Sequence, residues 1–367
     1  MRAENKTLNT KDNSSYICTG RVDWIIPILA VLISTMEILA SINYSSGESF
    51  LRINRGVLVM FIGGVTMLIV SRITYRVWLK GAGILSTTFF LLLLIRFFLE
   101  KAGVLTIDYP SWFMVGSASI YLPFILIALS CFSLAAVGEM RQLTDIFNLQ
   151  NGILINIIMT TASLYLCIGW KYMFFYFIMT GVVISVRFSG AVPAFIGFIS
   201  VLIGYVCSQM TAYSRRLEAF LDPSESAVGF EVMNNLYMIH SGGLFGRGIG
   251  STYGVMENGG TFYLISKLIQ DMGLVGVLCF LSLFALLFWR IIISITKAPD
   301  RIGFYMGLLI FLFFLGRLLC NVMVNLNLIP FVGIHLPFGG VGSHIALIDY
   351  LLLGVMMSIS RHRIERI

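Results

Sequence analysis

The chain has 367 residues, of which 58% are hydrophobic and only 12% are charged, and its mean hydropathy is +0.90. Globular proteins carry about 25% charged residues, so this composition excludes a soluble fold. Long runs such as 84–95 and 274–288 are apolar on nearly every side, whereas the strands of a membrane β-barrel alternate in polarity. The sequence therefore predicts an all-α, polytopic membrane protein.

Ten apolar stretches are long enough to cross a hydrocarbon core of about 30 Å. In chain order, the expected spans are 24–42, 57–70, 84–99, 120–137, 153–168, 174–186, 192–209, 261–288, 304–324 and 344–360. They form one membrane domain, at 23–360, between polar tails at 1–22 and 361–367. The connections are short except for a loop at 211–260 and a Gly/Pro-rich segment at 325–343. Long irregular segments are usually functional or disordered, so we expect an extracellular site in these two.

The 25 Lys and Arg residues give the chain a net charge of +7 and a pI near 9.1. With the expected spans in place, 15 of these basic residues fall on the side that holds both termini and 7 on the other side. Because cytoplasmic loops are enriched in Lys and Arg, we expect both termini to be cytoplasmic. This distribution explains the basicity. No basic patch is interleaved with aromatic residues on a soluble face, so no nucleic-acid partner is expected.

Ionisable residues are few inside the expected spans, where a charge costs several kcal/mol unless it is paired or hydrated. The six such residues are Glu37, Arg96, Lys267, Asp271, Arg317 and Asp349. Lys267 and Asp271 are four residues apart and share a helix face, so we expect them to neutralise one another. Structural pairing, a polar cavity and an ion pathway are the three interpretations of the set. The six cysteines form no CxxC pair, and neither a metal nor a cofactor is indicated.

Several motifs follow one another in the second half of the chain. They are RLEAFLDP at 216–223, SGGLFGRGIG at 241–250, MGLVG at 272–276, NVMVN at 321–325, LIP at 328–330, GIHLPF at 333–338 and SISRHR at 358–363. In this order they resemble RIxAFLxP, SGGLFGKGLG, ELGxxG, NxxVNxxLLPxxGIPLPFISYGGS and SISRHR of the SEDS family, the shape, elongation, division and sporulation proteins similar to FtsW, RodA and SpoVE. Weaker similarity extends upstream, so nearly the whole chain is covered.

The glycine-rich motif at 241–250 suggests how an anionic group could be bound. Gly242, Gly243 and Gly248 permit positive φ and close backbone approach, and unpaired N–H groups in such a loop can cradle a phosphate. Arg216 and Arg247 flank the loop, and their guanidinium groups suit a pyrophosphate. The alternatives are a tight turn for the glycines and a solvated rim for the arginines.

The resemblance implies a ten-span glycosyltransferase of the bacterial plasma membrane that polymerises peptidoglycan from lipid II, an undecaprenyl-pyrophosphate-linked disaccharide-pentapeptide. It also implies a class B penicillin-binding protein as partner. The family's proposed general base is the aspartate of a PExHTDF loop, where this chain has Phe262 or Thr261, depending on the alignment. Neither residue can accept a proton. Glu257 is the only carboxylate nearby and is the candidate catalytic base.

Other departures from the family pattern make its polar cavity more basic. Ile125 stands in place of a glutamate, Lys171 in place of an acid and Arg317 in place of a glutamine, four residues before Asn321. The resemblance therefore makes Lys171, Arg317 and Asn321 candidate substrate-binding residues, together with Arg216, Arg247 and the loop glycines. Three functions follow: a SEDS-type glycosyltransferase, a non-catalytic relative that binds lipid II or a penicillin-binding protein, and a transporter or flippase of lipid-linked intermediates.

Overall fold

The computed structural model of the chain describes residues 16–18, 22–40, 49–102, 112–115, 118–148, 152–167, 170–188, 214–223, 227–250, 262–339, 344–362 and 364–366. The helices are α1 (Ile25–Ala40), α2 (Ser49–Arg72), α3 (Tyr75–Lys101), α4 (Leu122–Leu134), η1 (Ala135–Glu139), η2 (Leu143–Phe147), α5 (Ile153–Leu166), α6 (Trp170–Arg187), α8 (Ser214–Leu221), α9 (Ala227–Gly242), α10 (Leu264–Thr296), α11 (Arg301–Asn325) and α12 (His344–Arg361). The strands are β1 (Tyr16–Cys18), β2 (Trp112–Val115), β3 (Ala118–Tyr121) and β4 (Ile364–Arg366).

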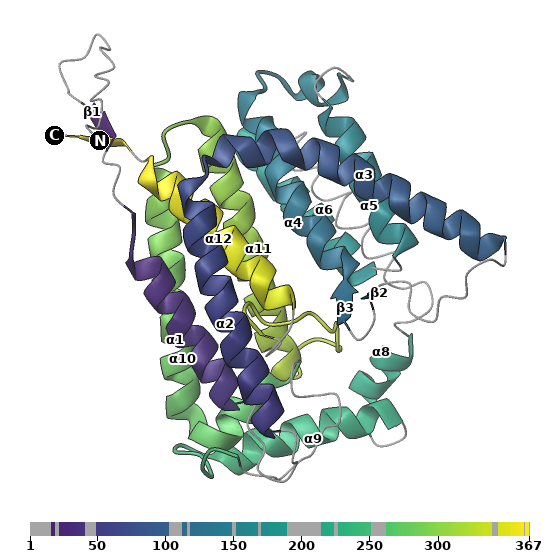
Figure 1. Cartoon of the computed structure of the whole chain (residues 1–367). Coiled ribbons are helices and arrows are strands. Elements are labelled where there is room, and N and C mark those ends of the chain that lie inside the picture. Colours follow the sequence, from purple (N-terminus) through teal and green to yellow (C-terminus); the bar gives the residue numbers. More distant parts are fainter. Residues whose placement is uncertain are drawn as a thin grey trace.

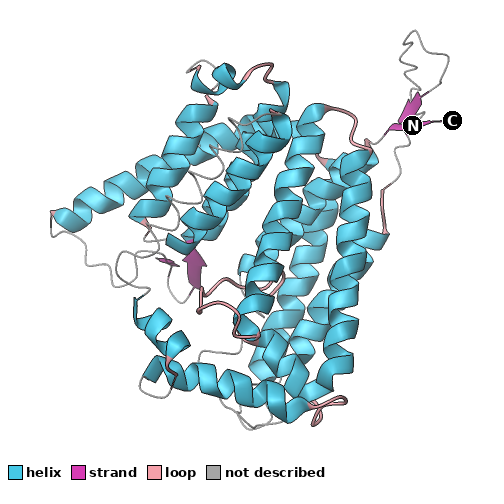
Figure 2. Cartoon of the chain, turned by 180° about the vertical axis from the view of Figure 1, so that it is seen from behind, coloured by secondary structure: helices cyan, strands magenta, loops and turns pink. Residues whose placement is uncertain are grey.

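The helices form two groups that meet at α11. One group contains α1, α2, α10 and α12, and the other contains α3, α4, α5 and α6 (Figure 1). Helix α11 packs against α10 and α12 on one side and against α4 and α6 on the other. A continuous apolar core runs through both groups. Figure 2 shows the same arrangement from behind, with helix as the dominant structure.

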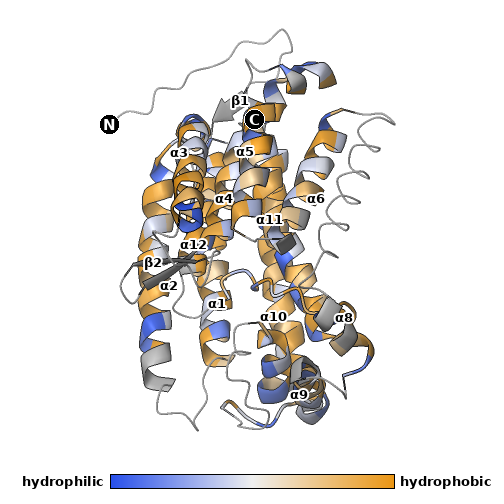
Figure 3. Ribbon diagram, turned by 90° about the vertical axis from the view of Figure 1, so that its right-hand side faces the viewer, coloured by the Kyte–Doolittle hydropathy of each residue, from blue (hydrophilic) through white to orange (hydrophobic). Residues whose placement is uncertain are grey.

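The two ends of the bundle differ in what they carry. At one end β1 pairs with β4 in antiparallel register, Tyr16 with Arg366, so a segment near the start of the chain lies beside one near its end (Figure 1). At the other end α9 lies across the bundle, next to α8. We call these the termini end and the loop end. Figure 3 shows hydrophobic residues along the length of the bundle and more hydrophilic residues toward its ends, as expected for a membrane domain.

The predicted all-α membrane fold is confirmed, with two short strand pairs in addition to the helices. Nine of the ten expected spans coincide with helices, and the span expected at 192–209 lies outside the described residues. Among those residues, five helices are long and apolar enough to cross a membrane: Ile53–Arg72, Tyr75–Lys101, Leu122–Glu139, Leu264–Thr296 and Arg301–Asn325. Helix α3 starts nine residues before its expected span, because basic side chains near a helix end can extend toward water without interrupting the helix.

The expectation that 211–260 is irregular is wrong for two stretches, since α8 and α9 form there. The start of α4 also differs from the prediction at 120, because β3 extends to Tyr121 and pairs there with β2.

Glycines allow α2 and α12 to approach closely. A Cβ at Gly63 would lie 2.2 Å from the ring of Tyr350, and a Cβ at Gly354 would lie 2.8 Å from the carbonyl oxygen of Met67. Small residues at helix contacts are the usual means of close packing in membranes, where lipid removes most of the hydrophobic driving force between helices. This contact fixes α12, which carries part of the site described next.

Candidate functional site

Two asparagines near the end of α11 hold the irregular backbone at the loop end. The Nδ2 atom of Asn321 donates to the carbonyl oxygens of Ile334 and Phe262, at 3.1 and 3.0 Å. The Nδ2 atom of Asn325, one turn later, also donates to the Phe262 oxygen, at 3.1 Å. Backbone outside helices at membrane depth must be satisfied by the protein. Asn321, 2% exposed, therefore anchors both the start of α10 and the segment after α11.

Asn325 extends this network to two further helices. Its Oδ1 atom accepts hydrogen bonds from the backbone nitrogen and the hydroxyl of Ser266, at 3.0 and 2.9 Å. Its carbonyl oxygen accepts from Nδ2 of Asn235 on α9, at 2.7 Å. All three side chains are buried, and their hydrogen bonds hold α9, the start of α10 and the end of α11 together, while Oδ1 of Asn235 has no partner among the described residues. The sequence analysis did not select Asn235, Ser266 or Asn325; the four-residue spacing of Asn321 and Asn325 on an apolar helix is the signal that points to them.

A buried ion pair lies beneath this network, between α11 and α12. Arg317 and Asp349 are both fully buried, and Nη1 of the guanidinium donates to Oδ1 of the carboxylate at 2.5 Å. The same guanidinium donates from Nε to the His335 carbonyl and from Nη2 to the Leu336 carbonyl, at 3.1 and 2.8 Å. Asp349 Oδ2 accepts from the Phe338 backbone nitrogen at 2.7 Å. We call this set of contacts the Arg317–Asp349 latch, because it binds both helices to residues 335–338.

Two expectations about intramembrane charges can be compared with the structure. Arg317 was expected to line a substrate cavity, but its side chain is 0% exposed, and the rings of Phe124 and Phe313 lie 4.3 and 5.1 Å from the guanidinium carbon. The guanidinium therefore donates its hydrogen bonds to the protein itself and does not line a cavity. The expected pairing of Lys267 with Asp271 is confirmed, with Nζ and Oδ1 3.0 Å apart. Structural pairing thus accounts for four of the six intramembrane charges.

Helix α10 is broken at Gly273, whose φ of 70° and ψ of −173° lie outside the helical region. In an uninterrupted helix, the Leu274 nitrogen would donate to the Gln270 oxygen and the Val275 nitrogen to the Asp271 oxygen. The break separates both pairs. In a membrane each unpaired backbone group would cost several kcal/mol, so these four groups need other partners.

The glycine-rich loop after α9 supplies these partners. The Gln270 and Asp271 oxygens accept hydrogen bonds from the Arg247 and Gly248 nitrogens at 2.8 and 3.0 Å, and the Leu274 and Val275 nitrogens donate to the Gly243 and Leu244 oxygens at 3.0 and 3.2 Å. Four bonds between loop and helix thus replace two within the helix. The glycines permit this approach, since a Cβ at Gly242 would lie 2.0 Å from the Ile269 oxygen and one at Gly246 would lie 2.3 Å from the Asp271 oxygen.

The prediction that this loop offers unpaired N–H groups to a phosphate is therefore wrong for three consecutive residues. The nitrogens of Gly246, Arg247 and Gly248 already donate to carbonyl oxygens of the protein. The tight-turn alternative agrees with the structure: Gly243 and Gly248 adopt positive φ, and Gly242 provides the close approach. The loop serves to complete the broken helix.

Two substitutions test this function of the loop. Gly246→Ala should destabilise the protein more than Gly248→Ala, by at least about 2 kcal/mol, because it displaces two loop–helix hydrogen bonds worth about 1 kcal/mol each. Both glycines have positive φ, but a Cβ at Gly248 meets nothing within 4 Å. Gly248→Ala should therefore cost only the backbone strain energy of about 1–2 kcal/mol. Thermal unfolding in detergent is the measurement. Equal midpoints for the two variants would contradict the close contact.

The two arginines expected to bind pyrophosphate both lie at the loop end. Arg216 on α8 is half-buried, with its guanidinium carbon 4.8 Å from the Phe331 ring and Nη1 donating to the Phe331 carbonyl at 3.3 Å. Arg247 is exposed, and its Nε donates to the Ser241 carbonyl at 2.9 Å. The structure thus orients one guanidinium against the segment after α11 and the other against the end of α9.

Aromatic rings surround the position where the family has its aspartate. The ring of Phe262 lies 5.3 Å from that of Phe331 and 4.3 Å from the imidazole of His335. Tyr263 stacks on Phe331 at 5.4 Å. A tyrosine phenol is neutral near pH 7, so Tyr263 cannot replace the aspartate as a base. Glu257 and Thr261 lie outside the described residues, and Lys171 is described only as backbone near the start of α6.

Comparisons with known proteins give a consistent result. The family model FTSW_RODA_SPOVE, described as "Cell cycle protein", matches residues 20–365. Stage V sporulation protein E of Bacillus subtilis is 28% identical over 87% of this chain and 90% of its own length, and the probable peptidoglycan glycosyltransferase FtsW of a Geobacter species is 25% identical over 92% and 96%.

Solved structures show the same fold. A structure described as "Structural coordination of polymerization and crosslinking by a peptidoglycan synthase complex" matches with a TM-score of 0.72 at 18% identity, over 93% of this chain and 98% of that one. The rod shape determining protein RodA of Thermus thermophilus matches with a TM-score of 0.67 at 18% identity, over 93% and 97%.

Proposed function

The chain belongs to the FtsW/RodA/SpoVE cell-cycle protein family, and on this basis we propose that it is a peptidoglycan glycosyltransferase that polymerises lipid II. The observation that carries the proposal is that relatives named as probable peptidoglycan glycosyltransferases match the chain over nearly its full length. The residues matched by the family model, 20–365, include those that form the broken helix, the asparagine network and both loop-end arginines in this chain. A complete scaffold of this kind favours a polymerase over a transporter.

The loop end divides into groups that would bind substrate and groups that position them. Arg216 and Arg247 would contact the pyrophosphate, since a guanidinium donates several hydrogen bonds to an oxyanion and keeps its charge at any physiological pH. Lys171 would add a further positive charge. Asn321 and Arg317 would act indirectly, because their donors hold residues 334–336 in place. Gly242, Gly243 and Gly248 would shape the loop that carries Arg247.

The proposed reaction needs a proton acceptor. The acceptor sugar hydroxyl loses its proton as its oxygen bonds to the anomeric carbon and the pyrophosphate leaves. Glu257 is proposed for this role because no carboxylate stands at 261 or 262. The loss of the family aspartate and the aromatic packing around Phe262 favour the non-catalytic alternative, in which the protein binds lipid II or a penicillin-binding protein without turnover.

Polymer formation separates these two functions. The purified protein is given lipid II, alone and with a class B penicillin-binding protein, and glycan strands are detected by gel electrophoresis. We expect strands that require the partner or increase with it, in keeping with the relative solved as a peptidoglycan synthase complex. Binding of lipid II with no strands under either condition would support the non-catalytic alternative.

The proposed topology places the loop end outside the cell and both termini in the cytoplasm. In a cysteine-labelling test, Phe245→Cys, at a position 82% exposed on the loop end, should react with a membrane-impermeant maleimide on intact cells. Arg301→Cys, at the exposed first residue of α11 at the termini end, should react only after lysis. The unsubstituted protein gives the background from native cysteines. The reverse pattern would overturn this orientation.

A further inference from the structure

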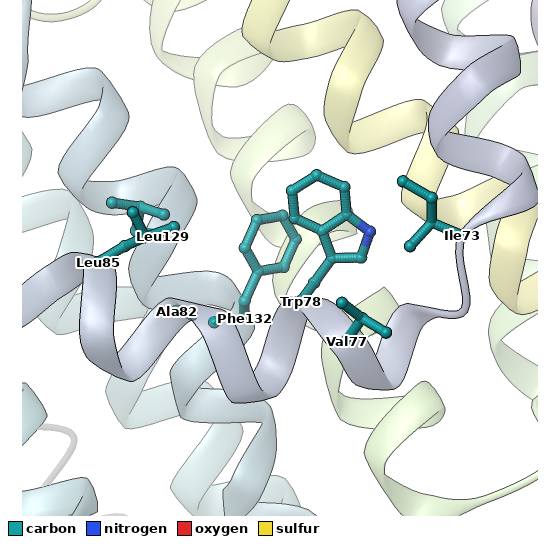
Figure 4. Close-up of a pocket in the computed structure, with 8 residues that line it drawn as sticks. Ile73, Val77, Trp78, Ala82, Leu85, Leu129 and Phe132 are labelled. Atoms are coloured by element: carbon teal, nitrogen blue, oxygen red, sulfur yellow. The ribbon is translucent and has the colours of Figure 1, made fainter.

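A groove lies between α3 and α4, in the half of the bundle near the termini end. Its α3 wall is formed by Val77, Trp78, Gly81 and Leu85, and its α4 wall contains Leu129 and Phe132 (Figure 4). The space measures about 490 Å³ including its open side, and no polar atom contributes to its surface. Gly81 leaves room that a side chain would fill, since a Cβ there meets nothing within 4 Å.

One polar atom beside the groove has no partner within the described part of the chain. The indole Nε1 of Trp78 is shielded from solvent and makes no hydrogen bond there, while the indole packs 5.7 Å from the ring of Phe132. A buried N–H without an acceptor is unfavourable in an apolar environment. Trp commonly sits at the membrane interface, where its N–H meets lipid carbonyl or phosphate oxygens. The N–H lies behind the apolar surface of the groove, so a molecule there that carries an acceptor would satisfy it after a turn of the indole ring.

Basic side chains lie next to the same groove. Lys80 is exposed on α3, three residues after Val77 and four before Ile84, and so shares their face of the helix. Val77 and Ile84 are 55% and 71% exposed, so this face borders lipid. Arg72, exposed at the end of α2, precedes the groove residue Ile73. An anionic headgroup at the termini end would meet both charges while its acyl chain lay in the groove.

From this arrangement we infer a binding site for an anionic glycerophospholipid of the leaflet at the termini end. One acyl chain occupies the groove over Gly81, the Trp78 N–H donates to an oxygen of the lipid, and Lys80 and Arg72 pair with the phosphate headgroup. The site is separate from the loop end and does not depend on the reaction proposed there. If a helix of a partner protein fills the groove in the membrane instead, the purified protein should bind anionic and zwitterionic phospholipids equally.

The occupant can be tested by filling the groove. Purified full-length protein is titrated with dioleoyl phosphatidylglycerol or dioleoyl phosphatidylethanolamine, and bound lipid is counted by native mass spectrometry. We expect at least about fivefold tighter binding of the anionic lipid, from one basic side chain near the surface. Gly81→Leu should abolish this binding. Gly83→Leu is the matched control, because a Cβ at Gly83 also meets nothing within 4 Å but this residue does not line the groove.

Two further variants examine the polar contacts. Trp78→Phe keeps an aromatic ring but removes the N–H, and should weaken binding of the anionic lipid by about 2- to 12-fold, the net effect of one hydrogen bond. Lys80→Gln should reduce the preference for the anionic lipid by about fivefold. Equal binding of the two lipids by the unsubstituted protein would overturn the proposal. Undiminished binding of the anionic lipid by Gly81→Leu would do the same.

Discussion

Glu257→Gln is expected to lower the rate of lipid II polymerisation by about 10²- to 10⁴-fold, the usual cost of losing a general base. The substitution removes the proton acceptor while keeping the size and hydrogen-bonding capacity of the side chain. Binding of lipid II should be unchanged, because the arginines proposed to contact the pyrophosphate remain. Single-turnover rates with purified protein and its penicillin-binding partner, measured beside lipid II affinity, separate chemistry from binding.

Two other carboxylates of the same segment, 211–260, provide controls. Asp222 and Glu231 are both exposed, and Asp222→Asn and Glu231→Gln should leave the rate within a few-fold of the unsubstituted protein. A rate that survives Glu257→Gln would remove Glu257 from the mechanism. The base would then come from another segment, such as Asp222 or Glu231, or from the imidazole of His335 near Phe262, a side chain of the type that most often transfers protons in enzymes. His335→Gln would test that replacement directly.

The second large effect is expected from Arg317→Met, which should destabilise the protein by about 3–5 kcal/mol. The substitution leaves the Asp349 carboxylate buried without its cation. It also leaves the carbonyl oxygens of His335 and Leu336 without their donors. Because these residues belong to the segment held beneath the asparagine network, polymerisation should fall with stability. Thermal unfolding in detergent, with and without lipid II, is the measurement.

A double substitution distinguishes the latch from simple loss of packing. Arg317→Met combined with Asp349→Leu removes both charges and should be more stable than the sum of the single effects predicts. Arg76→Met is the matched control: it also breaks an Arg–Asp pair, but the Arg76 and Asp300 side chains are 64% and 22% exposed, and an exposed pair contributes about 0–1 kcal/mol. Strict additivity of Arg317→Met and Asp349→Leu would show that the two residues act independently.

Local patterns in the sequence predicted those features that depend on residues close in the chain. Apolar run length located nine helices, and the spacing of Lys267 and Asp271 predicted their ion pair. Arg317 was also recognised as an intramembrane charge, but its partner lies 32 residues away on another helix. No local periodicity encodes that distance. The prediction that Arg317 lines a cavity was therefore wrong. The cost of burying a charge nevertheless marked Arg317 as an important residue.

The glycine-rich loop shows a different limit. Its composition indicated positive φ, which the structure confirms at Gly243 and Gly248, but the sequence could not show what its N–H groups bind. Those of Arg247 and Gly248 donate to carbonyl oxygens freed by the break at Gly273, in a helix whose apolar run predicted it to be continuous. A phosphate cradle and a cap for a broken helix require the same glycines. Only the tertiary structure distinguishes between them.

The latch also has a consequence for how the protein is made. Helix α11 leaves the ribosome with Arg317 in its apolar run, and a lone arginine at the centre of a helix opposes insertion by about 2.5–3.5 kcal/mol. Asp349 is synthesised 32 residues later, which takes roughly two to six seconds at 5–20 residues per second. During that interval α11 carries an unpaired cation in its apolar run, and the pair can form only once α12 has joined it. A chain truncated before α12 would keep that cation unpaired and should be less stable in the membrane than the full-length protein.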